Sequence, residues 1–241
     1  MFIDPSQLSR DPDKLEGIEK ATLRLVVQAL LDFRKDAWDI FQRELDAPQV
    51  VAEDITREAL ERLGAPTIRV RLFGRVDYKR AQYVLNKDYA VRQALFVDSK
   101  AEKGDPQSIT LQMSETSMRV RQVRGHQLVD IPGELKPIYV VRVGGRREKL
   151  LTTTILVRYA YADQPGGRRA LRSVDVVALP NGMLQNRYNP NAQDTIWIAG
   201  RNAPTLGEPF RVRLSLKLLS QKRRWRVQRI QRPGTGFHWE E

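Results

Sequence analysis

The hydrophobic pattern changes its period once along the chain, near residue 66, and this change restricts the folds open to it. Up to that point apolar residues recur at three- and four-residue spacing, over residues 14–45 and again over 51–63, which predicts a long amphipathic helix and a shorter one. Beyond it, apolar and polar residues alternate with the period of two that is typical of half-buried strands. Helices followed mostly by strands favour an α+β fold built on a mixed sheet.

Turn-forming residues divide the second part of the chain into short strands. Gly-Gly, Pro-Asn-Gly and Asn-Pro sequences separate the alternating segments. Strands are expected at residues 67–74, 75–85, 91–100, 138–143, 150–162, 170–179, 195–199, 208–219 and 223–231, and a short helix is expected near 108–120. No Pro/Gly/Ser-rich linker interrupts the chain, so its 241 residues are expected to form a single domain.

Positive charge is concentrated in the second half of the chain. Residues 1–120 carry a net charge of −1 and residues 121–241 carry +13, within a total of +12. A strongly cationic half indicates a polyanionic partner, and nucleic acid is the commonest one. The alternatives are a merely soluble basic surface and a basic protein at a membrane surface. The membrane alternative is disfavoured because the basic residues alternate along strands rather than lining amphipathic helices.

The composition excludes several kinds of site. The chain has no cysteine, which removes disulfides, cysteine-ligated zinc, iron–sulfur clusters and cysteine nucleophiles. It also lacks the glycine-rich nucleotide-binding motifs, G-x-S-x-G and H-E-x-x-H, and His126 and His238 are isolated. Metal chemistry would therefore use carboxylate oxygens, which suit Mg²⁺. No apolar run reaches the ~20 residues that cross a bilayer and no signal peptide is present, so we expect a soluble cytoplasmic protein without a membrane partner.

Chemistry-bearing residues end one buried strand. The sequence Ala-Leu-Phe-Val-Asp-Ser-Lys at residues 94–100 places four apolar residues before Asp98 and Lys100, which share one face because they are two apart on a strand. Asp77 lies on the neighbouring strand-like segment. If these strands pair, two carboxylates and one ammonium meet, and this set can hold Mg²⁺ at a scissile phosphate and orient or activate the attacking water.

Other assignments of these residues are open at this point. The chain contains three acid-x-Lys triplets, so the triplet alone is weak support. A competing set would join Asp54 and Asp77 to Lys79, and the triplet at 134–136 lies in a turn-like segment flanked by proline. Asp98 and Lys100 could also form an ordinary ion pair at the end of a strand.

Ordered blocks of sequence, rather than one motif, point to a family. They include LEGIEKATLR at 15–24, VDYKR at 76–80 and VDSKA at 97–101, with further blocks at 27–30, 52–56, 179–180, 187–190, 207–208 and 211–213. In these blocks the chain resembles the SfiI-like type II restriction endonucleases of the PD-(D/E)xK nuclease superfamily, and more distantly BglI. The resemblance implies a restriction-endonuclease-like α+β fold, with a mixed β-sheet core flanked by helices.

The resemblance also implies roles for residues near the triplet. Asp77, Asp98 and Lys100 match the catalytic residues of the family, which favours them over the set that ends at Lys79. Asp77, Asp98 and the backbone carbonyl of Ser99 would hold Mg²⁺, with Mn²⁺ as an alternative metal.

An upstream acid, Glu53, matches a residue that lies near the active site in related nucleases. In the alternative interpretation, Glu53 is an ordinary carboxylate near the start of a helix and pairs with Arg57, four residues later.

The implied reaction is Mg²⁺-dependent cleavage of both strands of double-stranded DNA at an interrupted GC-rich palindrome, leaving 5′-phosphate and 3′-hydroxyl ends. A palindrome implies a two-fold enzyme, so at least a homodimer is expected, and the resemblance makes a tetramer plausible. A DNA methyltransferase would belong to the same prokaryotic restriction-modification system. The alternatives are a non-catalytic sequence-specific DNA-binding protein and a repair or structure-specific nuclease of the same fold.

Candidate DNA contacts lie in the basic half. Arg211, Arg213 and Lys217 occupy alternate positions of an expected strand and would present cations to guanine edges, the commonest specific contact, or else to phosphates only. The expected contacts with the DNA backbone, which position without specifying, are Arg187, Asn189, Lys222, Arg223, Arg224 and Arg226. Within one nuclease domain we therefore expect N-terminal helices at 1–66, catalytic strands at 67–125 and a DNA-recognition half at 126–241.

Overall fold

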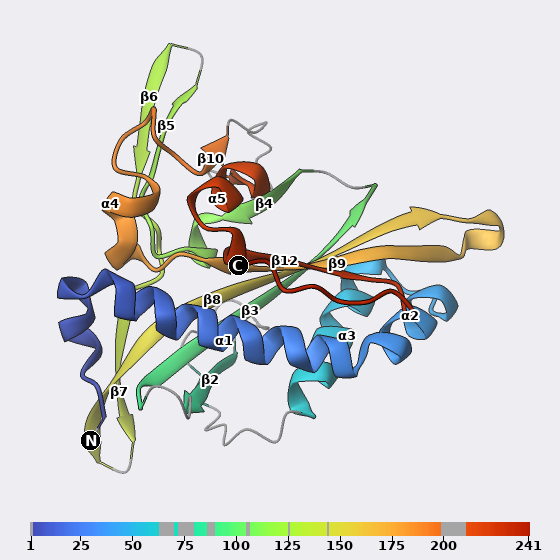
Figure 1. The fold of residues 1–241 in the computed structure, drawn as a ribbon, viewed down its shortest axis with the longest axis horizontal. Coiled ribbons are helices and arrows are strands. Elements are labelled where there is room, and N and C mark those ends of the chain that lie inside the picture. The colour runs from blue at the N-terminus through green and yellow to red at the C-terminus, as the bar shows by residue number, and fades with distance from the viewer. Residues whose placement is uncertain are drawn as a thin grey trace.

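A large mixed sheet forms the centre of the molecule, with helices packed on one face and two small sheets beside it (Figure 1). The computed structural model describes residues 2–62, 70–71, 80–85, 90–104, 107–124, 126–143, 145–198 and 211–241. Among these residues, no helix combines the length and the apolar character needed to cross a bilayer.

The helices precede most of the strands along the chain. The helical elements are η1 (Pro5–Arg10), α1 (Pro12–Asp32), α2 (Arg34–Arg43), α3 (Pro48–Glu61), η2 (Met113–Glu115), η3 (Pro165–Gly167), η4 (Gly182–Leu184), α4 (Gln185–Tyr188), α5 (Leu216–Lys222) and η5 (Arg224–Arg226). The strands are β1 (Val70–Arg71), β2 (Arg80–Leu85), β3 (Arg92–Lys103), β4 (Ser108–Gln112), β5 (Val120–Arg124), β6 (Gln127–Ile131), β7 (Ile138–Val143), β8 (Arg146–Asp163), β9 (Arg169–Leu179), β10 (Trp197–Ile198), β11 (Arg211–Ser215) and β12 (Val227–Gln231).

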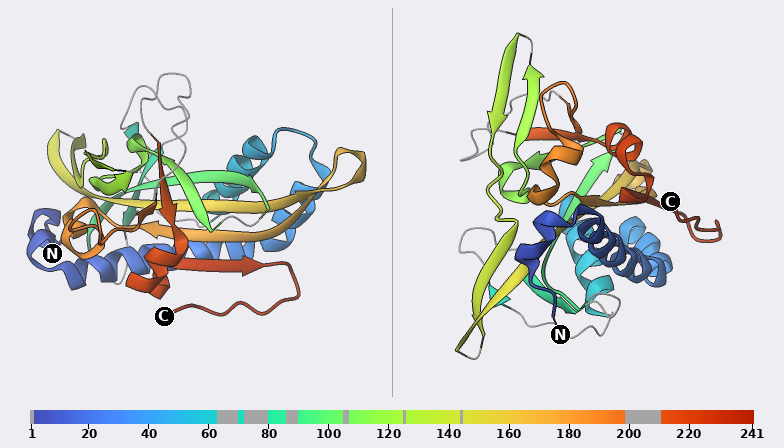
Figure 2. Two further views of the ribbon diagram at one scale, coloured as in Figure 1. Left: turned by 90° about the horizontal axis from the view of Figure 1, so that it is seen from above. Right: turned by 60° about the vertical axis from the view of Figure 1, so that its left-hand side comes forward.

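The strand order of the large sheet is β1-β2-β3-β8-β9-β12, with β7 also paired to β8. β3 and β8 run parallel over eleven residue pairs, and the other described pairs of this sheet are antiparallel. A second sheet has the order β10-β11-β4, and β5 and β6 form a ribbon that projects from the body (Figures 1 and 2). The mixed-sheet α+β fold predicted from the sequence is confirmed.

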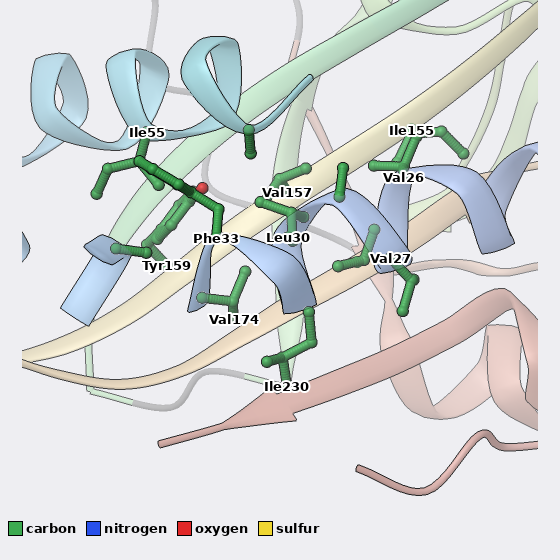
Figure 3. Close-up of a cluster of buried hydrophobic side chains, with 14 of the residues drawn as sticks. Val26, Val27, Leu30, Phe33, Ile55, Ile155, Val157, Tyr159, Val174 and Ile230 are labelled. Atoms are coloured by element: carbon green, nitrogen blue, oxygen red, sulfur yellow. The ribbon is translucent and has the colours of Figure 1, made fainter. Parts of the chain in front are cut away.

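One face of the large sheet is covered by α1, α2 and α3. Val26 and Leu30 of α1, and Phe33 just after it, pack on Val157 and Tyr159 of β8, and these residues are almost fully buried (Figure 3). At about 25 cal/mol per Å² of apolar surface, burial of this kind is the main stabilising contribution to such a layer.

The opposite face of the sheet carries a different set of side chains. Leu156 of β8 and Val177 of β9 pack there against Ile109 of β4 and Val212 of β11, all fully buried. Since β3 is in register with β8, alternate residues of β3 also point to this side. The sheet thereby places the polar end of β3 next to β4 and β11 rather than beneath the helices.

Several expected elements differ from the structure. The strand expected over 223–231 begins only at Val227, because Arg224–Arg226 form η5. The helix expected over 14–45 is two helices, because the chain bends at Phe33. This residue is both the C-cap of α1 and the N-cap of α2, and its side chain makes no capping hydrogen bond to α2. The helix expected near 108–120 is wrong: Ile109 and Leu111 alternate as buried strand residues of β4, and only the three residues of η2 are helical. The strand expected over 208–219 ends at Ser215, whose hydroxyl accepts from Leu218 N–H and starts α5.

Candidate active site and DNA interface

Asp98 and Lys100 lie together near the carboxyl end of β3, on the face that β4 covers. The buried residues Ala94, Leu95 and Phe96 anchor the strand before them. Lys100 Nζ lies 2.9 Å from Asp98 Oδ2, and the two side chains keep 21% and 23% of their surface exposed. An ammonium and a carboxylate thus meet at a partly accessible edge of the core, as the sequence predicts.

A second carboxylate contacts the same ammonium. Lys100 Nζ donates to Glu115 Oε1 over 2.9 Å. Burial of the ammonium opposes its charge, but the Glu115 and Asp98 carboxylates outweigh that cost and raise the pKa of Lys100 above its ordinary value. Lys100 is therefore held as a cation between two anions.

Glu115 is a site residue that the sequence reasoning missed. It ends η2, is almost fully buried, and accepts the Gln112 backbone N–H at Oε2 over 3.2 Å, in a capping box. The Gln-x-x-Glu spacing of Gln112 and Glu115 was the available signal, since this spacing is typical of a capped helical turn.

Gln49 of α3 makes hydrogen bonds to the backbone of β3. Its side chain donates to the Ser99 carbonyl oxygen over 2.5 Å and accepts the Ala101 backbone N–H over 3.0 Å, so it binds the edge of β3 as a neighbouring strand would. The same amide donates to Glu53 Oε1 over 2.7 Å. Glu53 therefore lies beside the site through Gln49, whereas Arg57, its alternative partner, pairs with Asp54.

The Ser99 side chain points to the helix-covered face of the sheet, away from Asp98 and Lys100. Its hydroxyl donates to Thr56 Oγ1 over 2.7 Å, and Thr56 is in turn 2.8 Å from the Tyr159 hydroxyl. Burial raises the pKa of Tyr159, which keeps this hydroxyl neutral. This buried chain fixes the backbone of β3 to α3, so the Ser99 carbonyl is held in place.

The donor atoms at the end of β3 fit a hard divalent cation, since a carboxylate of Asp98 and a backbone carbonyl of Ser99 are oxygen ligands. The described part of the chain contains no group of three or more Asp, Glu or His side chains that could hold a metal. Asp77 and Lys79 lie outside the described residues. Asp54, the third member of the competing set, is exposed and pairs with Arg57 Nη2 at 2.6 Å.

A small cavity of about 180 Å³ adjoins Lys100 between β3 and β4, lined by Gln49, Lys100, Ala101, Glu102, Thr110, Leu111 and Gln112. Glu102 lies two residues beyond Lys100 on the same strand face. Burial raises the pKa of Glu102, against the opposing effect of the positive charges of Arg158 and Arg213. Thr110, which lies opposite Arg213 in the β4–β11 pair, lines the same cavity as Glu102, so β11 comes close to the end of β3.

β11 brings its predicted DNA-reading residues to that same place. Within the β11–β4 pair, Arg211 lies opposite Gln112 and Arg213 lies opposite Thr110. Arg213 is half-buried, and its Nε makes no hydrogen bond to any of the described residues. Lys217 does not share their strand face, because it is an exposed residue of α5.

Two residues predicted to contact the DNA backbone lie in the interior instead. Arg226 is fully buried, and its Nη2 donates to Glu19 Oε2 over 2.6 Å. Asn189 is also fully buried, and its amide binds the backbone N–H and carbonyl of Arg121. Both side chains satisfy buried polar partners, so we do not retain either as a phosphate contact.

The remaining predicted phosphate contacts are nearer the surface. Arg224 and Arg223 are exposed, and Lys222 and Arg187 are half-buried. Arg187 Nη1 lies 2.7 Å from Asp13 and 3.1 Å from Glu16, and Arg223 Nε lies 3.2 Å from Glu16. Lys222 pairs with Asp194. A surface hollow of about 540 Å³ is lined by Lys217, Ser220, Gln221, Lys222, Arg223, Arg224 and Glu241.

Known proteins similar to this chain point to one family. The family model described as type II restriction enzyme SfiI matches residues 29–230. The type II restriction enzyme SfiI of Streptomyces fimbriatus is 33% identical over 228 residues, covering 90% of this chain and 84% of the relative.

Two solved structures have the same fold. The tetrameric restriction endonuclease SfiI bound to cognate DNA matches with a TM-score of 0.85 and 31% identity, over 100% of this chain and 92% of that one. The restriction endonuclease BglI bound to its DNA recognition sequence matches with a TM-score of 0.74 and 16% identity, over 94% of each chain. At this identity BglI supports the fold alone. The match to the family model and the identity with the SfiI relative together show that the chain belongs to the SfiI family of type II restriction enzymes.

Proposed function

We propose that this restriction endonuclease cleaves both strands of DNA at an interrupted, GC-rich palindrome in a Mg²⁺-dependent reaction, leaving 5′-phosphate and 3′-hydroxyl ends. The observation that carries the proposal is the position of Lys100 Nζ, 2.9 Å from both Asp98 Oδ2 and Glu115 Oε1 at the end of β3. A cation fixed beside an accessible carboxylate is what hydrolysis of a phosphodiester requires from the protein.

Asp77, Asp98 and the Ser99 carbonyl are the proposed metal ligands, and Glu53 is a further acid beside them. When bound, Mg²⁺ supplies positive charge against the scissile phosphate, and Mn²⁺ can substitute as another divalent cation with oxygen ligands. Lys100 orients the attacking water and offsets the negative charge that develops on the phosphate. Gln49 and the Ser99–Thr56 contact hold β3 so that these groups keep their positions.

β11 is the proposed recognition strand. Arg211 and Arg213 are two apart, so they share a face and each guanidinium can contact a guanine edge with two hydrogen bonds. The proposed phosphate contacts are Arg187, Lys222, Arg223 and Arg224, together with Lys217, which lies on α5 rather than on the recognition strand. The proposed division of the domain is N-terminal helices at 1–66, catalytic strands at 67–125 and a recognition half at 126–241. β4, from the catalytic part, pairs with the recognition strand β11.

The proposed enzyme is at least a homodimer, because a palindrome presents two identical half-sites. The tetrameric state of the related SfiI bound to cognate DNA supports a tetramer. The proposed setting is the prokaryotic cytoplasm, with a DNA methyltransferase in the same restriction-modification system.

Incubation of plasmid DNA with the protein tests the proposal. Discrete fragments that require Mg²⁺ or Mn²⁺ are expected, and run-off sequencing of the cut ends gives the target and the end chemistry. Binding without cleavage at any divalent metal would favour a non-catalytic DNA-binding protein. Cleavage that depends on DNA structure rather than sequence would favour a repair nuclease.

A further inference from the structure

We propose that Glu115 is the positioning residue of Lys100, and that it ties Lys100 to the recognition strand through β4. The inference rests on the proposed function of Lys100 and of β11. It concerns a carboxylate outside the predicted metal-ligand set, contributed by an element that follows β3 in the chain.

The contact is suited to fixing an ammonium. Lysine has three N–H donors, of which Glu115 Oε1 accepts one over 2.9 Å, while Asp98 Oδ2 lies 2.9 Å away as an ion-pair partner. The Glu115 side chain is only 3% exposed, against 23% for Asp98. A charge pair in the less hydrated environment is less screened, so Glu115 is the partner that restrains the Lys100 side chain more strongly.

Glu115 is itself held by short-range contacts. Its Oε2 accepts the Gln112 backbone N–H, and the Gln112 side chain accepts the Glu115 backbone N–H, so the turn is closed from both ends. The same turn is bound by the segment that follows β6, since Glu134 N donates to Met113 O over 2.9 Å and Leu135 N donates to Thr116 O over 3.1 Å. The carboxylate therefore has a fixed origin from which to hold Lys100.

The same turn is continuous with the strand that pairs with β11. Arg211 lies opposite Gln112, the residue that caps η2, and Arg213 lies opposite Thr110. A displacement of β11 when its arginines engage DNA would be carried by the β4 ladder to Gln112 and Glu115, and from there to Lys100.

Glu115→Gln separates the carboxylate's charge from its shape. Gln112 N–H and the Lys100 ammonium are both donors, and an amide offers one acceptor oxygen where the carboxylate offers two, so one contact is lost. We expect kcat on cognate plasmid to fall by about 10- to 100-fold, because a small misplacement of a reacting group costs this much. KM and the affinity for cognate duplex in Ca²⁺ should stay within about two-fold of wild type.

Glu134→Gln is the matched control. Glu134 is exposed and its backbone binds the same turn, so this variant makes the same change of charge without touching Lys100. It should cleave like wild type. If Glu115→Gln does not fold, as judged by its thermal unfolding, Glu115→Asp keeps the charge and withdraws the carboxylate by one methylene, and the same loss in kcat is expected.

Arg213→Ala then tests the link to β11. If the link exists, the loss of kcat in the double variant with Glu115→Gln is smaller than the product of the two single losses, whereas multiplicative losses would overturn it. Wild-type kcat in a folded Glu115 variant would overturn the positioning role. Lys100→Ala, run beside them, keeps the two proposals apart: if it is inactive the proposed site stands, and if it cleaves normally the proposed catalytic role of Lys100 fails, whatever the Glu115 variants do.

Discussion

Arg226 Nη2 donates a 2.6 Å hydrogen bond to Glu19 Oε2 in the interior, where the side chains of both residues are almost completely excluded from solvent. Arg226 Nε donates to the Tyr188 hydroxyl over 2.6 Å, and that hydroxyl donates to Glu16 Oε1. Glu19 also accepts the Asn181 backbone N–H. The network joins α1 to α4 and to η5, three elements far apart in the sequence.

Arg226→Met should lower the free energy of unfolding by about 3–5 kcal/mol, because removal of one member leaves Glu19 as a buried carboxylate without its cation. Urea denaturation measures this difference. Arg224→Met is the control, since Arg224 is an exposed residue of the same turn η5 and should change stability by no more than about 0.5 kcal/mol. Equal stability of both variants would show that the buried pair contributes nothing.

Asp98→Ala should lower plasmid cleavage by at least about 100-fold, because it removes an electrostatic group beside the scissile phosphate. Lys100→Ala should do the same. Both variants should still bind DNA in a gel-shift assay with Ca²⁺. Lys79→Ala is the control for the competing triplet, and loss of cleavage in this variant but not in Lys100→Ala would show that the wrong lysine was assigned.

DNA affinity should fall steeply with salt. Each phosphate contact contributes about −0.9 to the slope of log K against log salt, so the five proposed contacts from each subunit of a dimer predict a slope of about −9. The measurement is equilibrium binding to cognate duplex in Ca²⁺ over a range of salt concentrations. A nearly flat dependence would remove the basic half as a phosphate-binding surface.

Arg213→Ala should reduce the ratio of specific to non-specific affinity, by about 1–3 kcal/mol for each lost guanine contact. Arg224→Ala should instead weaken both affinities together, since phosphate contacts are independent of sequence. Competition between cognate and scrambled duplexes at one salt concentration measures the ratio. If it is unchanged in both Arg211→Ala and Arg213→Ala, base reading lies elsewhere, with residues 181–202 as the next candidate.

The raised pKa of Glu102 predicts a pH-dependent effect on stability. The native state binds this proton more tightly than the unfolded chain, whose glutamate titrates near 4.3, so the contribution of Glu102 to stability is present at low pH and is lost as pH rises through the native pKa. Glu102→Gln removes the stability loss that accompanies ionisation of Glu102, because glutamine does not ionise. The stability of the variant relative to wild type should therefore improve between pH 4.5 and pH 7 in urea denaturation, and a constant or opposite difference would contradict the raised pKa. Glu134→Gln provides the exposed-carboxylate control.

The strands of the large sheet could be predicted well from the sequence because their periodicity is local. β3, β7, β8 and β9 lie where the sequence pattern places them. Asp98 and Lys100 share a face for the same reason. The prediction failed where short segments change type, as at residues 108–120, because three to five residues contain too little of either period to distinguish a strand from a helix.

By itself the sequence determined the order of helices and strands, the location of the basic half, and the pairing of Asp98 with Lys100 two residues apart. Only the tertiary structure decided which distant groups meet them. It placed Glu115 on Lys100, Gln49 on the edge of β3, and Arg226 against Glu19 rather than on the surface. Periodicity reports which face of an element is buried, but the partner of a buried charge is fixed by how separate elements pack, and this information is not local.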